Sequence, residues 1–150
     1  MELLIIKLLK SLKEKIKMKH KNQLLSTIWI FVTLNYLYCD LIGLMDSTLL
    51  KQYLTGNVEG LKINESFLLY AGILMEIPIA MVLLSKILPK KINCWANIIA
   101  GAIKTIVMIA TLFIGIVTMY YLFFAVIEVA TTIFIVVYAL KWLKQKEEFA

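Results

Sequence analysis

Apolar residues run along this chain in four long blocks that are separated by shorter polar segments. The blocks cover residues 24–45, 67–88, 96–118 and 120–140. An α-helix needs about 20 residues to cross the hydrocarbon core of a membrane, and each block approaches or exceeds that length. The apolar runs are continuous rather than alternating, which favours helices over the strands of a membrane barrel. The sequence therefore predicts an all-α fold, a four-helix transmembrane bundle.

Polar segments flank the predicted membrane domain, which extends over residues 24–142. Residues 1–23 carry apolar side chains at helical spacing among lysines. That pattern is typical of a basic amphipathic helix lying on an anionic membrane surface. Met18 offers an alternative start to Met1 within this segment. A short cytoplasmic tail is expected over residues 143–150.

The loop over residues 46–66 is the one sizeable connection between the predicted spans. Its apolar residues predict a short interfacial helix, and Asn64 or Ser66 is expected to cap the second span. The loop could lie as a lid over an opening of the bundle, or rest on the headgroups as a simple connector. Within the second span, Pro78 removes a helix hydrogen bond, which predicts a kink and a free carbonyl at Leu74.

Composition and charge placement support a membrane protein. Of the 150 residues, 61% are hydrophobic, and the formal net charge is +6. Soluble domains average about 45–50% apolar residues. The lysines gather before the first span, between the second and third, and after the fourth, whereas only Lys51 and Lys62 lie on the other side. The positive-inside rule therefore predicts a cell-membrane protein with both termini in the cytoplasm, and the basic charge predicts topology rather than nucleic-acid binding.

Each predicted span has one Asp, Glu or Lys side chain away from its ends, and these are Asp40, Glu76, Lys104 and Glu128. A charge at such a position costs about 2.5–3.5 kcal/mol on insertion scales, so these groups generally face the bundle interior. At a rise of about 1.5 Å per residue, all four come out near the midplane or toward the outer side, so we expect them to share one site. Three carboxylates against one ammonium predict that at least one acid is protonated or neutralised by a bound cation.

Aromatic and amide side chains on the same helix faces extend this candidate ligand-binding site. Tyr36 lies on the face of the first span, Asn97 on that of the third, and Tyr121 and Phe124 on that of the fourth. Aromatic rings beside a carboxylate suit an organic cation, which makes Glu128 the best candidate for a ligand-facing acid. The pattern predicts a small cationic or lipid-like ligand.

Two interpretations of Lys104 stay open. It is either a structural salt-bridge partner of Glu76 or Glu128, or a counter-ion that responds when a ligand binds. The cysteines, Cys39 and Cys94, are expected about a membrane thickness apart, beyond the Cα separation of about 7 Å that a disulfide allows. We find no motif for a catalytic residue, a metal site or a cofactor, so none is predicted.

Five short strings, specific only when taken together, are spread over the predicted membrane domain. They are Trp29 with Tyr36, Tyr38 and Asp40; Ile73 to Pro78; Asn93 to Ile99 with Gly101; Tyr120 to Phe124 with Glu128; and Lys141 with Trp142. Over about residues 24–142 the chain resembles an uncharacterised family of short bacterial four-span membrane proteins, a domain of unknown function. The resemblance implies a multi-pass membrane protein and brings no known activity. Similar members need not carry an acid where Glu76 stands, which favours Asp40 and Glu128.

Three classes of function are compatible with these features. The leading hypothesis is a small membrane protein, which could be a homodimer, that binds or transports a cationic or lipid-like ligand. The second is a non-catalytic structural or accessory subunit whose intramembrane charges determine helix packing. The third, and the least supported, is a membrane-embedded lipid-modifying enzyme that would use two carboxylates as acid and base.

Overall fold

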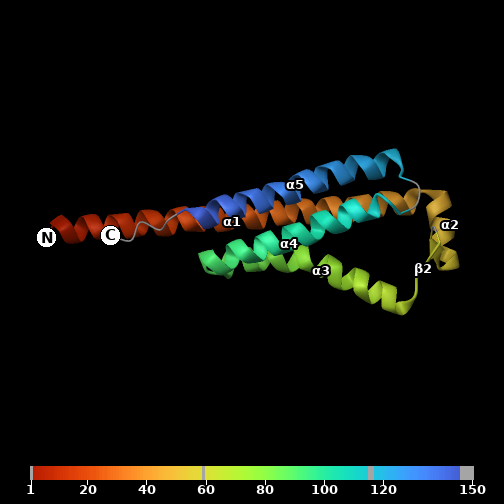
Figure 1. The fold of residues 1–150 in the computed structure, drawn as a ribbon, viewed down its shortest axis with the longest axis horizontal. Coiled ribbons are helices and arrows are strands. Elements are labelled where there is room, and N and C mark those ends of the chain that lie inside the picture. Colours follow the sequence, from red (N-terminus) through yellow and green to blue (C-terminus); the bar gives the residue numbers. More distant parts are fainter. Residues whose placement is uncertain (1, 59, 115–116, 146–150) are drawn as a thin grey trace.

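The computed structural model describes residues 2–58, 60–114 and 117–145, so Met1, Glu59 and most of the predicted tail lie outside the described residues. Four long helices pack side by side: α1 (Glu2–Met45), α3 (Glu65–Ile87), α4 (Lys90–Thr111) and α5 (Met119–Lys144). A short helix, α2 (Ser47–Thr55), and a hairpin of β1 (Asn57–Val58) and β2 (Leu61–Lys62) connect α1 to α3. Figure 1 shows the resulting elongated bundle.

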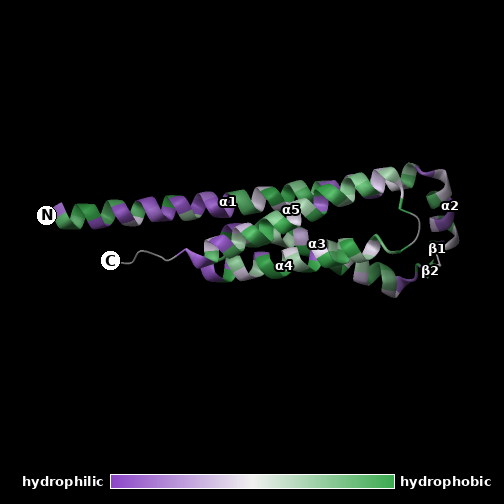
Figure 2. Ribbon diagram, turned by 45° about the horizontal axis from the view of Figure 1, so that its top comes forward, coloured by the Kyte–Doolittle hydropathy of each residue, from purple (hydrophilic) through white to green (hydrophobic). Residues whose placement is uncertain are grey.

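Helix α1 joins the basic N-terminal segment and the first apolar block in one continuous helix. We expected a separate element over residues 1–23, but the structure has no break at that boundary. Neither glycine nor proline occurs between Glu2 and Ile42 to interrupt the helix. Residues 2–20 are exposed and project beyond the bundle, with alternating hydrophilic and hydrophobic bands in Figure 2. Taken as a whole, α1 is an apolar helix and is not shown to be amphipathic.

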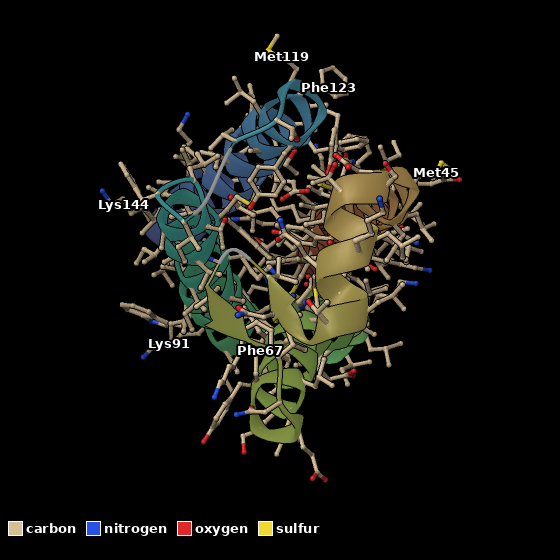
Figure 3. The ribbon with its side chains drawn as sticks, turned by 90° about the vertical axis from the view of Figure 1, so that its right-hand side faces the viewer. Met45, Phe67, Lys91, Met119, Phe123 and Lys144 are labelled. Atoms are coloured by element: carbon tan, nitrogen blue, oxygen red, sulfur yellow. The ribbon has the colours of Figure 1, made fainter. Side chains whose placement is uncertain are left out.

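Side-chain caps organise the connection between α1 and α3. The Oδ1 atom of Asp46 accepts the backbone N–H groups of Thr48 and Leu49, at 2.9 and 3.3 Å, and so begins α2. Gly56 ends α2 at a φ of 68°, a left-handed conformation that glycine adopts without steric cost. Asn64, one of the two caps that we predicted for the second span, accepts the backbone N–H of Phe67 at 2.8 Å. The sharp turns hold α2 and the hairpin across this end of the bundle (Figure 3).

The four long helices form a ring in the order α1, α3, α4, α5. Helix α1 packs against α3 and α5, and α4 packs extensively against α5 and less against α3. We call the end that carries α2 and the hairpin the loop end, and the opposite end the terminal end. Helix α3 lies beside α4 at the terminal end and diverges from it toward the loop end (Figure 1). Its buried residues, Pro78, Met81 and Ser85, all lie in its second half.

Apolar side chains occupy both the inside and the outside of the bundle. The largest fully buried apolar residues include Leu25, Trp29 and Ile135. Many large apolar residues, such as Phe31 and Phe123, are exposed on the outer surfaces of the helices. Figure 3 shows Phe123 pointing away from the other helices. An apolar outer surface of this extent suits contact with lipid rather than with water.

Gly101 allows the close approach of α4 and α5, and we expect its replacement by alanine to destabilise the bundle. An added Cβ atom would lie 2.7 Å from Cγ2 of Val136 and 3.3 Å from the carbonyl oxygen of Thr132. Overpacking of this kind costs about 1–3 kcal/mol. Thermal unfolding in lipid nanodiscs would measure the loss. The matched control is Gly72→Ala, because an added Cβ there meets nothing within 4 Å. Equal stability of the two variants would contradict tight α4–α5 packing.

Candidate ligand site between the four helices

A network of buried polar side chains ties the helices together in the terminal half of the bundle. The indole Nε1 of Trp29 donates a hydrogen bond to Oδ1 of Asn97 at 2.7 Å, which joins α1 to α4 across the ring. The Nδ2 atom of Asn97 donates to the carbonyl oxygen and to Oδ1 of Asn93, at 2.9 and 2.6 Å. Asn93 in turn donates to the carbonyl oxygen of Ser85 at 2.7 Å, which adds α3. All four side chains are fully buried, so this network closes the terminal half with paired polar groups.

The network differs from our prediction for Asn97. We expected Asn97 to line the ligand site. The structure instead places it among hydrogen-bonding partners in the terminal half of the bundle. Sequence reasoning did not identify Asn93 or Ser85 as its partners. Helical spacing could have indicated Asn93, which precedes Asn97 by four residues and therefore lies on the same face. No pattern in the sequence indicated Ser85, because it lies on a different helix.

A cavity of about 180 Å³ lies nearer the loop end, and we call it the charged cavity. All four long helices contribute to its walls. The lining residues are Tyr36, Cys39 and Asp40 from α1, Leu74 and Met75 from α3, Lys104, Val107, Met108 and Thr111 from α4, and Tyr121 and Glu128 from α5. The structure thus brings together five of the eight predicted site residues, namely Tyr36, Asp40, Lys104, Tyr121 and Glu128.

Glu128 has an unusual environment in this cavity. Its side chain is 1% exposed, and neither carboxyl oxygen has a hydrogen-bond partner among the described residues. The hydroxyl group of Tyr36 is also buried without a partner. Buried polar groups are almost always hydrogen-bonded, so an exception indicates a functional group or a missing ligand. Glu128 therefore lines the cavity with a buried carboxyl group whose hydrogen-bonding capacity is unused within the described structure.

Lys104 contacts an aromatic ring and a sulfur atom rather than a carboxylate. Its Nζ atom lies 3.9 Å from the centroid of the Tyr36 ring and 4.0 Å from Sδ of Met75. Within the described part of the chain, buried Lys104 and Glu128 form no salt bridge. Lys104 is 4% exposed, and its ammonium group makes a cation–π interaction that joins α4 to α1. The sequence left two interpretations of Lys104 open, and one of them was a structural salt bridge. The structure shows no such salt bridge between Lys104 and Glu128.

The other predicted site residues lie in different surroundings. Asp40 lines the charged cavity but is itself exposed. Glu76 is exposed on the outer surface of α3 and does not line the cavity. Phe124 is half-buried and packs edge to face against Phe123, at a centroid separation of 5.4 Å. The structure thus gathers three of the four intramembrane charges, and Glu76 stays apart because the face it shares with Gly72 turns outward.

A second cavity of about 430 Å³ lies at the loop end, and we call it the vestibule. Helix α2, the hairpin, the end of α4 and the start of α5 surround it. Its lining residues are Asp46, Thr48, Leu49, Gln52, Tyr53, Val58, Leu61, Thr111, Ile114, Val117, Thr118, Tyr120 and Tyr121. Thr111 and Tyr121 line both cavities, and the Tyr121 hydroxyl donates a hydrogen bond to Oγ1 of Thr111 at 2.7 Å. These two side chains form the boundary between the vestibule and the charged cavity.

Thiol and metal chemistry receive little support from the geometry. Cys39 and Cys94 are both buried and free. In the described ranges, no group of three or more His, Cys, Asp or Glu side chains is placed to hold a metal ion.

Four helices that are long and apolar enough to cross a membrane, packed around a charged interior, indicate a multi-pass membrane protein. The chain belongs to a family of unknown function, DUF6326, whose model matches residues 13–149. The predicted resemblance to a domain of unknown function is confirmed at this level. No curated protein and no solved structure matches the chain. The matched range contains both cavities.

Proposed function

We propose that this protein binds a small organic cation in the charged cavity, with Glu128 as the principal ligand group. One observation carries the proposal: the Glu128 carboxyl is fully buried at a cavity, and both of its oxygens lack a partner among the described residues. Leaving such a group unpaired is costly for folding. A bound cation would pair with it and offset that cost.

The charge balance of the cavity supports a cationic ligand. Asp40 and Glu128 contribute two carboxyl groups, whereas Lys104 contributes one ammonium group. If both carboxyl groups are ionised, one additional positive charge makes the cavity neutral. The Tyr36 ring already accepts a cation, the ammonium of Lys104, at 3.9 Å. The cavity thus combines the carboxylate and aromatic groups that favour binding of an ammonium-type ligand.

The two halves of the bundle support entry from the loop end. Paired and fully buried polar side chains block the terminal half, as described for Asn97 and its neighbours. The charged cavity adjoins the vestibule at the other end. The lysine distribution favours a cell-membrane topology with cytoplasmic termini and with the basic N-terminal segment near the anionic inner leaflet. Under that topology, the ligand would enter from outside the cell, and a transport cycle would require the terminal half to open.

A second candidate function is a non-catalytic accessory subunit. The exposed carboxyl group of Glu76 favours it, since a polar group on a membrane-facing helix surface is expensive unless a partner covers it. A second copy of this chain, giving a homodimer, would be one such partner. Under this alternative, the charges serve assembly, and no cation binds at Glu128.

Binding of tetramethylammonium to the protein in lipid nanodiscs, measured by equilibrium dialysis, tests the proposal. We expect Glu128→Gln to weaken binding more than about 30-fold, because removal of one partner of a buried charge pair costs about 2–5 kcal/mol. The matched control is Glu76→Gln, which removes a carboxylate outside the cavity and should leave binding unchanged. Equal effects of the two substitutions, or no binding above that of empty nanodiscs, would refute a cation site at Glu128.

A further inference from the structure

The vestibule and the charged cavity are adjacent chambers of different character. The charged cavity holds two carboxyl groups and an ammonium group in about 180 Å³. The vestibule is larger, about 430 Å³, and its wall contains apolar and aromatic side chains such as Leu49, Leu61 and Tyr120. Sites for small organic ligands usually measure about 300–1,000 Å³ and are mostly apolar with a few polar groups. The charged cavity alone is below that range, whereas the vestibule lies within it.

We propose that the ligand is an amphiphilic monocation that occupies both chambers, with its ammonium head at Glu128 and its aromatic or apolar body in the vestibule. This inference rests on the function proposed above and extends it, because it names the class of ligand and assigns a second binding site. The shared lining residues, Thr111 and Tyr121, place the two chambers next to each other along one path. A ligand with a charged group at one end and an apolar group at the other would place the first in the charged cavity and the second in the vestibule.

The Tyr121–Thr111 hydrogen bond lies on the path between the two chambers. The Tyr121 hydroxyl donates to Oγ1 of Thr111 at 2.7 Å, and Oγ1 of Thr111 donates in turn to the carbonyl oxygen of Met108 at 2.8 Å. A ligand that extends through the boundary must displace the Tyr121 hydroxyl from Thr111. A compact cation confined to the charged cavity need not break this bond once it is inside. The bond should therefore oppose binding of the longer ligand only.

Two probes separate the head from the body of such a ligand: tetramethylammonium and benzyltrimethylammonium. We expect benzyltrimethylammonium to bind the protein in nanodiscs about 10- to 100-fold more tightly, as burial of one phenyl-sized apolar group provides. Empty nanodiscs correct for partition of the benzyl compound into lipid. A ratio near one would overturn the proposal, since the body would then make no contact.

Substitutions that fill the vestibule provide the decisive test. Leu61→Trp places a large ring in the chamber at a residue that is 41% exposed, and Leu49→Trp does the same from α2. Both should reduce the preference for benzyltrimethylammonium to near one and leave tetramethylammonium binding unchanged. The matched control is Leu54→Trp, at an 81% exposed residue of α2 that does not line the vestibule. A preserved preference in the properly folded Leu61→Trp variant would overturn the proposal.

Removal of the boundary hydrogen bond should have the opposite effect. Tyr121→Phe keeps the ring and loses the hydroxyl, so the longer ligand no longer has to break the bond to Thr111. We expect its affinity to rise about two- to tenfold relative to that of tetramethylammonium. An equal change for both probes would contradict a boundary role. If both probes require Glu128 but neither responds to the vestibule variants, this inference fails and the cation site stands, whereas loss of the Glu128 dependence would overturn both.

Discussion

Replacement of Asn97 by alanine is expected to lower the apparent melting temperature of the protein by about 2–12 °C. The substitution removes the acceptor for the indole N–H of Trp29 and the donor to the side chain and backbone of Asn93. Those groups are buried inside a bundle of candidate membrane helices, away from water that could replace the lost partners. An unsatisfied buried group costs about 1–3 kcal/mol. For a chain of this size, each 1 kcal/mol shifts the melting temperature by about 2–4 °C.

Thermal unfolding in lipid nanodiscs, followed by tryptophan fluorescence, measures this effect. The matched control is Asn35→Ala, because the side chain of Asn35 donates only within its own helix, to the carbonyl oxygen of Phe31 at 3.0 Å. Trp29→Phe should destabilise as well, and its combination with Asn97→Ala should cost less than the sum of the two, because both remove the same bond. A melting temperature for Asn97→Ala equal to that of Asn35→Ala would contradict a structural role for the network.

The second large effect is an expected gain in stability when the charged side chains of the charged cavity are replaced by apolar ones. We expect the double variant Glu128→Met/Lys104→Met to be more stable than the parent by about 1–4 kcal/mol. Replacement of buried charges by apolar side chains of similar volume is often stabilising by that amount, because the desolvation cost of the charges disappears. The expectation is strong here because neither Glu128 oxygen has a hydrogen-bond partner in the described structure. The same variant should not bind a cation.

The single variant Lys104→Met should change the stability in the opposite direction from the double variant, which tests this prediction. Lys104→Met alone leaves the carboxyl groups of Asp40 and Glu128 in one cavity without an opposing charge, so it should lower the free energy of unfolding. Adding Glu128→Met should restore the loss and exceed it. If the double variant were instead less stable than the parent, the charges would contribute to packing. That result would favour an accessory subunit over a ligand-binding protein.

The two predictions assign different roles to the two halves of the bundle. The polar network around Asn97 is paired and buried, which is typical of a structural element. Glu128 is buried at a cavity and unpaired, so its carboxyl is retained at a cost in stability. Functional sites commonly carry such a cost, and removal of the group then raises stability while activity is lost. The structure therefore places hydrogen-bonded polar side chains in the terminal half and an acid without a partner among the described residues nearer the loop end.

Much of the architecture was predictable from local sequence features. The apolar blocks are long and uninterrupted, and a helix is the simplest structure that satisfies every backbone polar group within a membrane. The cap of α3 at Asn64, one of the two that we predicted, was also predictable, since an N-cap depends only on the residues that follow it. The one continuous α1 was not predicted. We divided it where the composition changes, but composition does not end a helix without a breaker or a cap.

The site was only partly predictable, as Glu76 and Glu128 illustrate. Both are single acids within apolar blocks, and both share a helix face with small residues, so helical spacing alone predicted that both face the bundle interior. Packing distinguishes them: α5 packs extensively against α4 and buries Glu128, whereas α3 packs less against α4, diverges from it toward the loop end and leaves Glu76 exposed. Similarly, the sequence shows that Asn97 is polar, but it does not show that Asn97 pairs with Ser85, because Ser85 lies on another helix.

The sequence alone establishes that four segments of this chain are long and apolar enough to cross a membrane and that each has one Asp, Glu or Lys side chain away from its ends. These properties depend only on residues that are close together along the chain, so they can be predicted without knowledge of the tertiary structure. Contacts between helices decide the remainder: which charges meet, that Lys104 lies over Tyr36 rather than beside Glu128, and that the loop closes a vestibule. Those features depend on the rotation and divergence of each helix against its neighbours, which no single segment of sequence encodes.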